Sequence, residues 1–501
     1  MSITSTHPLY EKRSFQWALL RDVFEGEDAI KMKGEKYLPK ASGSTREQYE
    51  AYKKRARWNN FTARSLDGRH GLIFRRKPVI NCSDEFKNLG LLENIDRRGT
   101  NLYQFLSDSI YDCMKTCFGG YLVDIPRAEG VTTKAEAEKQ GIRPYLRYYP
   151  AESIINWGYT VINGVEQLGF VVLQENVETF EEDEFSHTIK TQYRVLDVRG
   201  GKYRQRLFTE NDDGEYIEES LDVVINGRSL SEIPFLTIPS KEPEKPMFYD
   251  LAVCNIGHYQ KVADYENGVH LTTIPTGYVT GHKQNIGKNG EHEVIQLGHD
   301  AFLMFEESDA TVGTLCFSGE GLTHSETAIS QAMLDMEILG SRMLSSGKTN
   351  ESADSAKIHR VGENAMLATF TRNVSEKISK AITIMAEWSG LQEKIEVNLC
   401  TDYDTQAFDP NALNALANLA EAGKLPMPYV FWNLKNGEYA PNDSDYHEYA
   451  TLLQMEAEGF TPLEQLEYMQ KKQNSSSGSV MSISTKSENR LNNNKEAEDN
   501  Q

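Results

Sequence analysis

Two segments, FYDLAVCNIGHYQKVADYENGVHLT at residues 248–272 and SETAISQAMLDMEILGSRML at 325–344, say most about the architecture of this chain. Apolar residues recur in both stretches at steps of three and four, which predicts a helix in each. The first helix is about 37 Å long if it is continuous. The segment between them contains short strand-like runs and is too small for a large core of its own. We therefore expect the two helices to pack antiparallel, as one projecting hairpin.

The chain continues through the polar loop SSGKTNE into a third helix of some ten turns, from about residue 352 to 388. KIEVNL then predicts a strand. Asp409-Pro410 marks the start of a helix that Gly423 ends, because proline favours the first turn and glycine the residue after the last one. A final helix is expected over 443–458. From Gln473 onward the chain is rich in Ser, Asn, Lys and Glu, which predicts a disordered tail.

Upstream of the hairpin the sequence mixes helices with strands. EQYEAYKKRARWNNFTARSL (47–66) has a helical stripe and belongs to a basic region, Arg46 to Lys77. This region is either a nucleic-acid patch or a solvated helix face. Asp67-Gly68 predicts a turn into a short edge strand near Pro78. A helix over 101–118 precedes a run of strands over 143–225 that Asn-Gly, Gly-Gly and Asp-Gly turns separate. The fold class is therefore α+β.

Composition limits the functions available. The 53 Lys and Arg against 74 Asp and Glu give a net charge of −21. Such acidity argues against tight DNA binding, but it suits a surface past which DNA slides, and equally simple solubility. No apolar run is long enough to span a bilayer, and no signal peptide is evident, so we expect a cytoplasmic site of synthesis. The six scattered cysteines predict buried free thiols rather than a zinc site.

The sequence contains no complete catalytic motif among those considered. Ser346-Gly347-Lys348-Thr349 looks like the end of a phosphate-binding loop, but that loop needs a glycine where Arg342 stands. The histidines of the insert, His282, His292 and His299, lack a metal-ligand spacing. HExxH and GxSxG are absent. We therefore expect no enzyme activity, no metal and no cofactor.

The order of elements resembles that of tailed-bacteriophage portal proteins, the subunits of the ring through which double-stranded DNA enters and leaves a viral head. Several phrases are similar to one group of these proteins, over roughly residues 30–465: KYLPK, YKKRARWNN, RPYLRYYPAESIINW, HYQKVADYENGVHLTTIPTGYVTG, SGEGL and ESADSAKIHR. The resemblance implies a wing (1–247), a first stem helix (248–272), a clip (273–318), a second stem helix (319–346), a tunnel loop with a long wing helix and a strand (347–407), a crown (408–470) and a disordered tail (471–501).

The resemblance also implies a location and partners. About twelve copies would form a ring at one capsid vertex of the virion, after assembly in the host cytoplasm and without any membrane. Partners would be the major capsid protein, a scaffolding protein, the large terminase subunit, a head–tail adaptor, and DNA held without sequence preference. Lys348 and Thr349 would face the channel, where a lysine from each subunit forms a ring of positive charge. The clip surface for terminase or adaptor would include Lys283, Asn285, Lys288 and Asn289.

Two other classes of protein are alternatives to a portal subunit. One is a different phage structural protein, such as a minor head or adaptor subunit, and the other is an enzyme with an unrecognised site. Met333, Met336 and Met343 form a seam on the second helix. Because methionine repacks easily, this seam suits an adjustable interface between subunits, although methionines also fill the cores of monomers.

Overall fold

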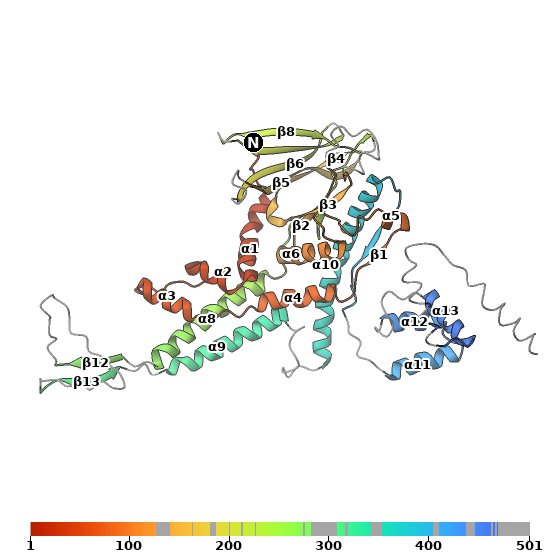
Figure 1. Cartoon of the computed structure of the whole chain (residues 1–501). Coiled ribbons are helices and arrows are strands. Elements are labelled where there is room, and N and C mark those ends of the chain that lie inside the picture. Colours follow the sequence, from red (N-terminus) through yellow and green to blue (C-terminus); the bar gives the residue numbers. More distant parts are fainter. Residues whose placement is uncertain are drawn as a thin grey trace, which may run out of the picture. The chain divides into compact units, whose positions relative to one another are not determined.

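The computed structural model forms two compact units, residues 1–403 and 404–501, and its helices and strands are labelled in Figure 1. The mixture of helices and sheets expected from the sequence is confirmed. The structure describes residues 2–126, 141–162, 164–180, 187–199, 201–211, 214–225, 227–273, 276–281, 308–315, 319–341, 353–403, 410–436, 446–461, 464–465 and 468.

The first unit begins with helices and one short strand. They are α1 (Pro8–Glu25), α2 (Glu27–Met32), η1 (Gly34–Lys36), α3 (Arg46–Arg55), α4 (Phe61–Ile73), β1 (Val79–Asn81), α5 (Asp84–Asn88) and α6 (Leu102–Thr116). Side chains cap several of these helices: Thr45 forms a capping box with Gln48 at the start of α3, and Asn101 caps α6. Such caps satisfy backbone N–H groups that have no partner within the helix.

The sequence-based prediction was wrong for residues 56–68. The helix breaks at Ala56, and Asn60 caps a new helix that runs through Asp67 and Gly68 without turning. The reason is tertiary packing: Leu66 and Ile73 of α4 are both fully buried in the core. Burial of this face outweighs the weak helix propensity of glycine. The edge strand near Pro78 exists as β1, and it pairs antiparallel with β14 (Glu396–Asn398).

Two sheets follow, and the run of strands and turns predicted over 143–225 is confirmed. A three-stranded sheet has the order β11-β2-β3, and a five-stranded sheet has the sequential order β4-β5-β6-β7-β8. All pairs in both sheets are antiparallel. A further small hairpin pairs β9 with β10. The bounds are β2 (Gly119–Asp124), β3 (Tyr145–Pro150), η2 (Ala151–Ser153), β4 (Ile154–Ile162), β5 (Val165–Phe180), β6 (His187–Arg199), β7 (Lys202–Glu210), β8 (Tyr216–Asp222), β9 (Val224–Ile225), β10 (Arg228–Ser229) and β11 (Phe235–Ile238).

Glycine allows the three-stranded sheet to pack closely. A Cβ atom on Gly120 would lie 2.2 Å from the Phe235 ring, which is too close for any side chain. Gly120 therefore lets the Phe235 ring approach the strand closely. The two glycines do not end α6, as the sequence suggested: the helix ends at Thr116, Cys117 adopts the left-handed conformation after it, and Gly119-Gly120 open β2.

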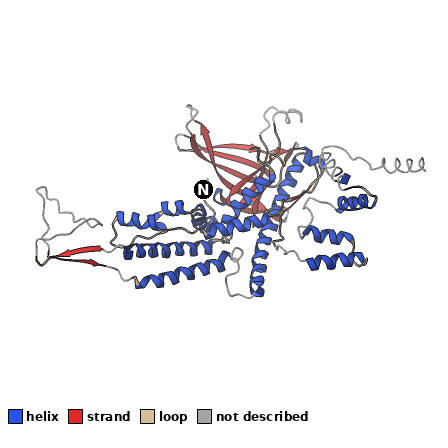
Figure 2. Cartoon of the chain, turned by 60° about the horizontal axis from the view of Figure 1, so that its bottom comes forward, coloured by secondary structure: helices blue, strands red, loops and turns tan. Residues whose placement is uncertain are grey.

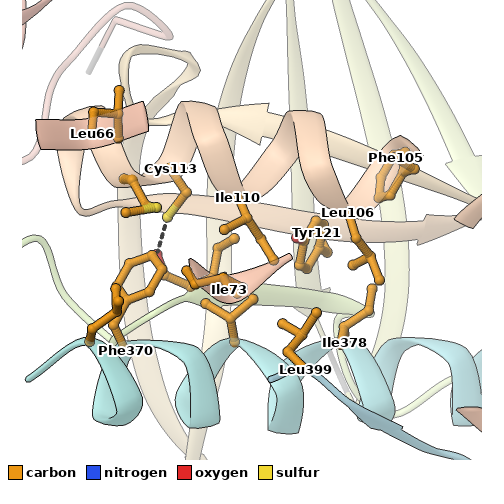
Figure 3. Close-up of a cluster of buried hydrophobic side chains, with 14 of the residues drawn as sticks. Leu66, Ile73, Phe105, Leu106, Ile110, Cys113, Tyr121, Phe370, Ile378 and Leu399 are labelled. Carbon is orange, nitrogen blue, oxygen red and sulfur yellow. Dashed lines mark hydrogen bonds between the residues drawn. The ribbon is translucent and has the colours of Figure 1, made fainter. Parts of the chain in front are cut away.

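The main core lies where α6 and the long helix α10 (Ala353–Trp388) pack against the three-stranded sheet β11-β2-β3. Figure 3 shows residues of this cluster from α4, α6, β2, α10 and the segment after β14. Ile110, Tyr121 and Ile378 are almost fully buried there. Cys113 and Cys117 are buried free thiols, as expected, whereas Cys82, Cys254 and Cys400 are only half-buried.

The remaining elements of the first unit are α8 (Tyr249–Thr273), β12 (Thr276–Thr280), β13 (Thr311–Leu315), α9 (Glu320–Met336) and the π-helical turn η3 (Glu337–Ser341). The second predicted helix thus starts five residues earlier than residue 325 and ends in a π-turn. The third helix, α10, is confirmed almost to the residue. The second unit contains α11 (Pro410–Glu421), α12 (Met427–Asn436) and α13 (Tyr446–Ala457).

Candidate functional site

The most distinctive feature of the first unit is the hairpin of α8 and α9, which lie side by side in Figures 1 and 2. The helices are antiparallel, because residues late in α8 meet residues early in α9. Tyr265 donates a hydrogen bond of 2.6 Å to Glu326, and Leu322 fills the space beside Gly268. At the other end of the hairpin, Leu251 packs where Gly340 leaves room. The predicted pairing of these helices is therefore found.

A small antiparallel ribbon continues the hairpin beyond the helices. β12 leaves the end of α8, and β13 leads back toward α9. Tyr278 lies over Gly313 across the two strands, where a Cβ would lie 2.6 Å from the ring. The insert predicted between the helices thus begins and ends as one strand pair.

Helix α8 is packed on two opposite sides. One side contacts α3 and the segment after it: Tyr52 donates a 2.6 Å hydrogen bond to Asp264, and Trp58 packs edge-on against Tyr259. The opposite side contacts α9 through Tyr265 and Cys254. Basic residues of the 46–77 region that contact α8 therefore serve packing within the chain. Arg55, for example, donates to Asn267 at 2.8 Å, which is a packing role and neither of the two roles expected for this region, a nucleic-acid patch or a solvated helix face.

The hairpin is acidic. Over α8, α9 and η3 the single basic side chain other than histidine is Lys261. The acidic residues of the same segments are Asp250, Asp264, Glu266, Glu320, Glu326, Asp335 and Glu337. A surface of this sign repels phosphate groups.

Much of α9 is open to solvent in the single chain. Only Ala332 and Met336 of α9 are buried. Ile338 is 56% exposed, and Leu334 and Met333 are partly exposed as well. The expected methionine seam therefore divides: Met336 belongs to the chain's own core, Met333 lies at the surface, and Met343 is outside the described residues.

The residues assigned to function from sequence are not placed by the structure. Lys348 and Thr349, and the clip residues Lys283, Asn285, Lys288 and Asn289, all lie outside the described residues. So do Arg342, the three histidines of the insert, and the tail from residue 471. The roles suggested for them stay predictions.

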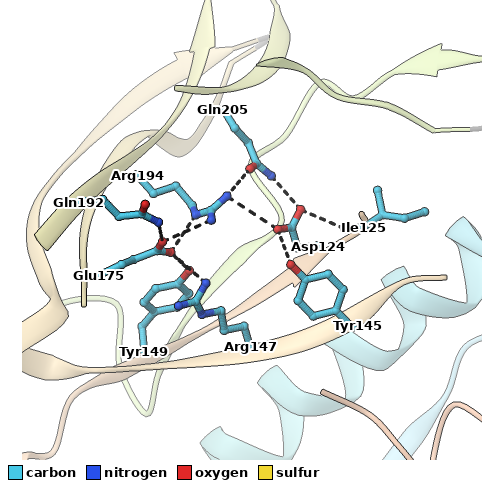
Figure 4. Close-up of polar contacts among 9 residues, drawn as sticks. All are labelled: Asp124, Ile125, Tyr145, Arg147, Tyr149, Glu175, Gln192, Arg194 and Gln205. Carbon is cyan, nitrogen blue, oxygen red and sulfur yellow. Dashed lines mark hydrogen bonds and ion pairs between the residues drawn. The ribbon is translucent and has the colours of Figure 1, made fainter. Parts of the chain in front are cut away.

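A second candidate site, which the sequence did not reveal, is a polar cluster between the two sheets (Figure 4). At its centre is Glu175 of β5, whose side chain is fully buried. Arg194 of β6 donates to Glu175 at 2.8 Å, and Gln192 donates at 2.6 Å. From the three-stranded sheet, Tyr149 also donates to this carboxylate, and Arg147 forms a 3.2 Å ion pair with it.

The cluster extends to a second buried carboxylate. Arg194 donates to Gln205 of β7 at 2.8 Å, and Gln205 donates in turn to Asp124 of β2 at 2.9 Å. Tyr145 of β3 donates to the other oxygen of Asp124. We name Asp124, Tyr145, Arg147, Tyr149, Glu175, Gln192, Arg194 and Gln205 the sheet junction, because they come from both sheets.

The electrostatics of the sheet junction suit a structural role. Burial alone would raise the pKa of Glu175, but the hydrogen bond and charge of Arg194, with help from Arg147, lower that pKa to about 2. Burial and the nearby Glu175 raise the pKa of Tyr149 well above its usual value. A general acid or base at neutral pH needs a pKa near 7. Glu175 stays ionised and fully engaged instead, so the junction holds the two sheets together.

Two open clefts lie beside this region. One has a volume of about 360 Å³ and borders Tyr149 and Glu175. The other, of about 580 Å³, borders Arg21, which bridges Asp112 of α6 and Glu152 of η2.

Within the part of the chain that the structure describes, no three His, Cys, Asp or Glu side chains are grouped to hold a metal ion. No helix among the same residues is long and apolar enough to cross a membrane.

Comparisons with known proteins add one sequence match. Residues 247–389 match a family model described as a domain of unknown function, DUF4055. These residues run from the start of α8 through the hairpin to the end of α10. No curated protein matches the chain.

Solved structures give low-similarity matches. A chain in the neck of an empty GTA particle, computed with C6 symmetry, is 12% identical, with a TM-score of 0.35 over 74% of this chain and 88% of that one. A chain in the neck of the native particle, computed with C12 symmetry, is 12% identical, with a TM-score of 0.32 over 74% and 87%. A chain in the virion of the native gene transfer agent particle is 12% identical, with a TM-score of 0.33 over 79% and 94%. TM-scores of this size do not establish a shared fold.

Proposed function

We propose that this chain is a structural subunit of a phage-like particle, and specifically a portal subunit that assembles into a ring around a DNA channel. The observation that supports this most is the antiparallel hairpin of α8 and α9, extended by the β12–β13 ribbon and followed by the 36-residue helix α10. This order of elements is the feature by which the sequence resembles portal proteins.

The surfaces of the hairpin support the proposal in two ways. Its acidic residues would let DNA pass without adhering, since phosphate contacts need Lys or Arg. The exposed apolar residues Leu334 and Ile338 of α9 and η3 lack cover within the described part of the chain. Apolar side chains grouped on a surface commonly mark a contact with another protein. A neighbouring subunit in a ring would supply that contact.

Partners and channel residues follow as parts of the same proposal. The ribbon and the residues between β12 and β13, with Lys283, Asn285, Lys288 and Asn289, would meet the terminase or the adaptor. The five-stranded sheet and its surroundings would face the major capsid protein and the scaffold. Lys348 and Thr349, which follow η3 in the sequence, would lie beside the lumen.

The ring is tested directly by the mass of the purified protein in solution. A stable monomer or dimer at micromolar concentration and moderate salt would contradict it.

The role of the residues after η3 is tested with the variant Lys348→Glu. That variant should assemble normally but impair DNA packaging or retention. Normal packaging by the variant would remove Lys348 from the proposal and leave the ring untouched.

A further inference from the structure

Two arginines of the first unit lie close enough to repel each other, beside the start of β3. Arg97 is exposed, in the segment between α5 and α6, and Arg143 is half-buried, just before β3. Arg143 Nη2 donates to the carbonyl of Asn94, which lies in the same segment as Arg97. Among the residues that the structure describes, neither guanidinium group forms an ion pair with a carboxylate. We name Arg97 and Arg143 the arginine pair.

Hydrogen bonds hold the loop from which Arg97 extends. The Asn94 side chain accepts from the N–H of Gly99 at 2.9 Å. The Asp96 side chain accepts from the N–H of Arg98 at 2.8 Å. Arg97 itself has a φ of 63°, in the left-handed region that residues other than glycine seldom adopt. The loop therefore fixes the position of the Arg97 side chain, and Asp96 is engaged by the backbone.

The Arg97 side chain lies over an aromatic ring of the neighbouring strand. Its guanidinium carbon is 5.7 Å from the centroid of the Tyr145 ring. The hydroxyl of that ring donates to Asp124 of the sheet junction at 2.9 Å (Figure 4), so the ring is held in place. This contact uses a face of the guanidinium group. Within the described part of the chain its five N–H donors make no hydrogen bond, and they remain available for an acceptor.

Arg143 lies in an unfavourable environment in the single chain. Its Nη1 is buried and has no hydrogen-bond partner among the described residues. Burial, followed by the charge of Arg97, lowers the pKa of Arg143, and the charge of Asp96 offsets only part of that shift. A buried donor without a partner and two like charges side by side both destabilise a fold. An anion between the two guanidinium groups would remove both penalties.

We propose that the arginine pair is a binding site for a phosphate group, either free phosphate or a phosphate of a nucleic-acid backbone. Guanidinium groups bind phosphate through paired N–H donors. A carboxylate has two oxygens, which a single arginine satisfies, whereas a phosphate has enough oxygens for two arginines to share. Arg98, the next residue and also exposed, adds positive charge to the same loop. The site lies outside the acidic hairpin and does not depend on the proposed ring.

Thermal unfolding of the full-length protein tests the site, with inorganic phosphate compared against chloride at equal ionic strength. Millimolar phosphate should raise the Tm of the wild type, because a ligand that binds only the folded state stabilises it. Phosphate also stabilises proteins in general, so the matched control is Arg64→Gln, at an exposed position of α4. The control should keep the whole phosphate effect, and Arg97→Gln should lose the part due to binding. By titration calorimetry, the Kd for phosphate should rise on the order of tenfold in Arg97→Gln.

The Tm in chloride separates binding from a purely structural role for Arg97. If Arg97 only packs on Tyr145, then Arg97→Gln lowers the Tm in chloride and leaves the response to phosphate intact, which would overturn the proposal. If Arg97 is a binding residue beside Arg143, its removal relieves repulsion between like charges. The Tm of Arg97→Gln in chloride should then equal or exceed that of the wild type. Arg143→Lys, which keeps the charge but loses the paired donors, should also bind phosphate more weakly.

A short labelled DNA duplex of mixed sequence distinguishes the two sources of phosphate. Duplex binding that inorganic phosphate competes away, and that Arg97→Gln weakens, assigns the site to a nucleic-acid backbone. Binding of inorganic phosphate without binding of the duplex assigns it to free phosphate. Equal phosphate effects in the wild type, Arg97→Gln and Arg64→Gln would show a general salt effect and overturn the site. That result would leave the proposed ring standing, because none of these measurements depends on assembly.

Discussion

The sheet junction and the α8–α9 hairpin use charged residues in opposite ways. At the junction, Glu175 and Arg194 are turned inward, paired and hydrogen-bonded on all sides. On the hairpin, the charged residues are nearly all acidic, and the ion pairs described for them, Asp250 with Lys245 and Glu266 with Arg57, are made by side chains that are at least partly exposed. The junction stabilises one chain, whereas in the proposed ring the hairpin would present its surface to other molecules.

Removing one partner from the junction should give the largest effect. Arg194→Ala leaves Glu175 buried without its main counter-charge, which typically costs about 3–5 kcal/mol of unfolding free energy. Lys190→Ala, on an exposed position of the same strand, should change stability by less than about 0.5 kcal/mol. Chemical denaturation measures both, and equal stabilities for the two variants would contradict the structural role of the junction.

The junction should also give the protein a marked acid sensitivity. The pKa of Glu175 is lowered from 4.5 to about 2 on folding, so its contribution is full above pH 4.5 and is lost as pH falls toward 2. A shift of this size corresponds to about 3 kcal/mol. In Glu175→Gln this part of the pH dependence of unfolding should disappear. Glu178→Gln, at an exposed site on the same strand, should keep it; loss in both variants would assign the sensitivity elsewhere.

The two methionines of α9 sharpen the boundary between core and surface. Met336→Ala removes a fully buried side chain and should cost about 2 kcal/mol or more. Met333→Ala, three residues earlier and 38% exposed, should cost less than half as much. Thermal unfolding of the two variants compares them directly. Similar losses would mean that the whole of α9 belongs to the chain's own core.

The smallest effect on stability is expected at the outer face of the hairpin. Leu334→Ser should alter the unfolding free energy of the unassembled chain by no more than about 0.5 kcal/mol, because the side chain is exposed there. The same variant should weaken assembly, as sedimentation at a series of concentrations would show. If assembly is unaffected, this face of α9 is not a contact between copies.

The sequence predicted local structure better than contacts between distant residues. Alternating apolar residues and Gly-containing turns predicted the strands from β3 to β8, and helical spacing predicted α6, α8 and α10. The turn expected at Asp67-Gly68 failed because the burial of Leu66 and Ile73 keeps α4 helical. The pairing of β1 with β14 joins residues far apart in the sequence, such as Val79 and Asn398, and neither strand alone indicates its partner.

The sheet junction was missed for a similar reason. Glu175, Arg194 and Gln205 lie on three different strands, and a polar residue within a strand usually predicts a solvent-facing position. A signal did exist, because Glu175 and Arg194 share the side of their strands that carries Leu173 and Leu196, both buried. A polar residue two positions from a buried apolar residue of the same strand lies on the buried side of the sheet. To see that two such residues face each other, however, one must know the register between their strands, which the sequence alone does not give.

The central claim, that this chain builds a ring, is tested most directly by the mass of the full-length protein in solution. Light scattering coupled to gel filtration, confirmed by native mass spectrometry, should give about twelve copies of the 56.7 kDa chain, a particle of roughly 680 kDa. A single species of one or two copies at micromolar concentration and moderate salt would contradict the account.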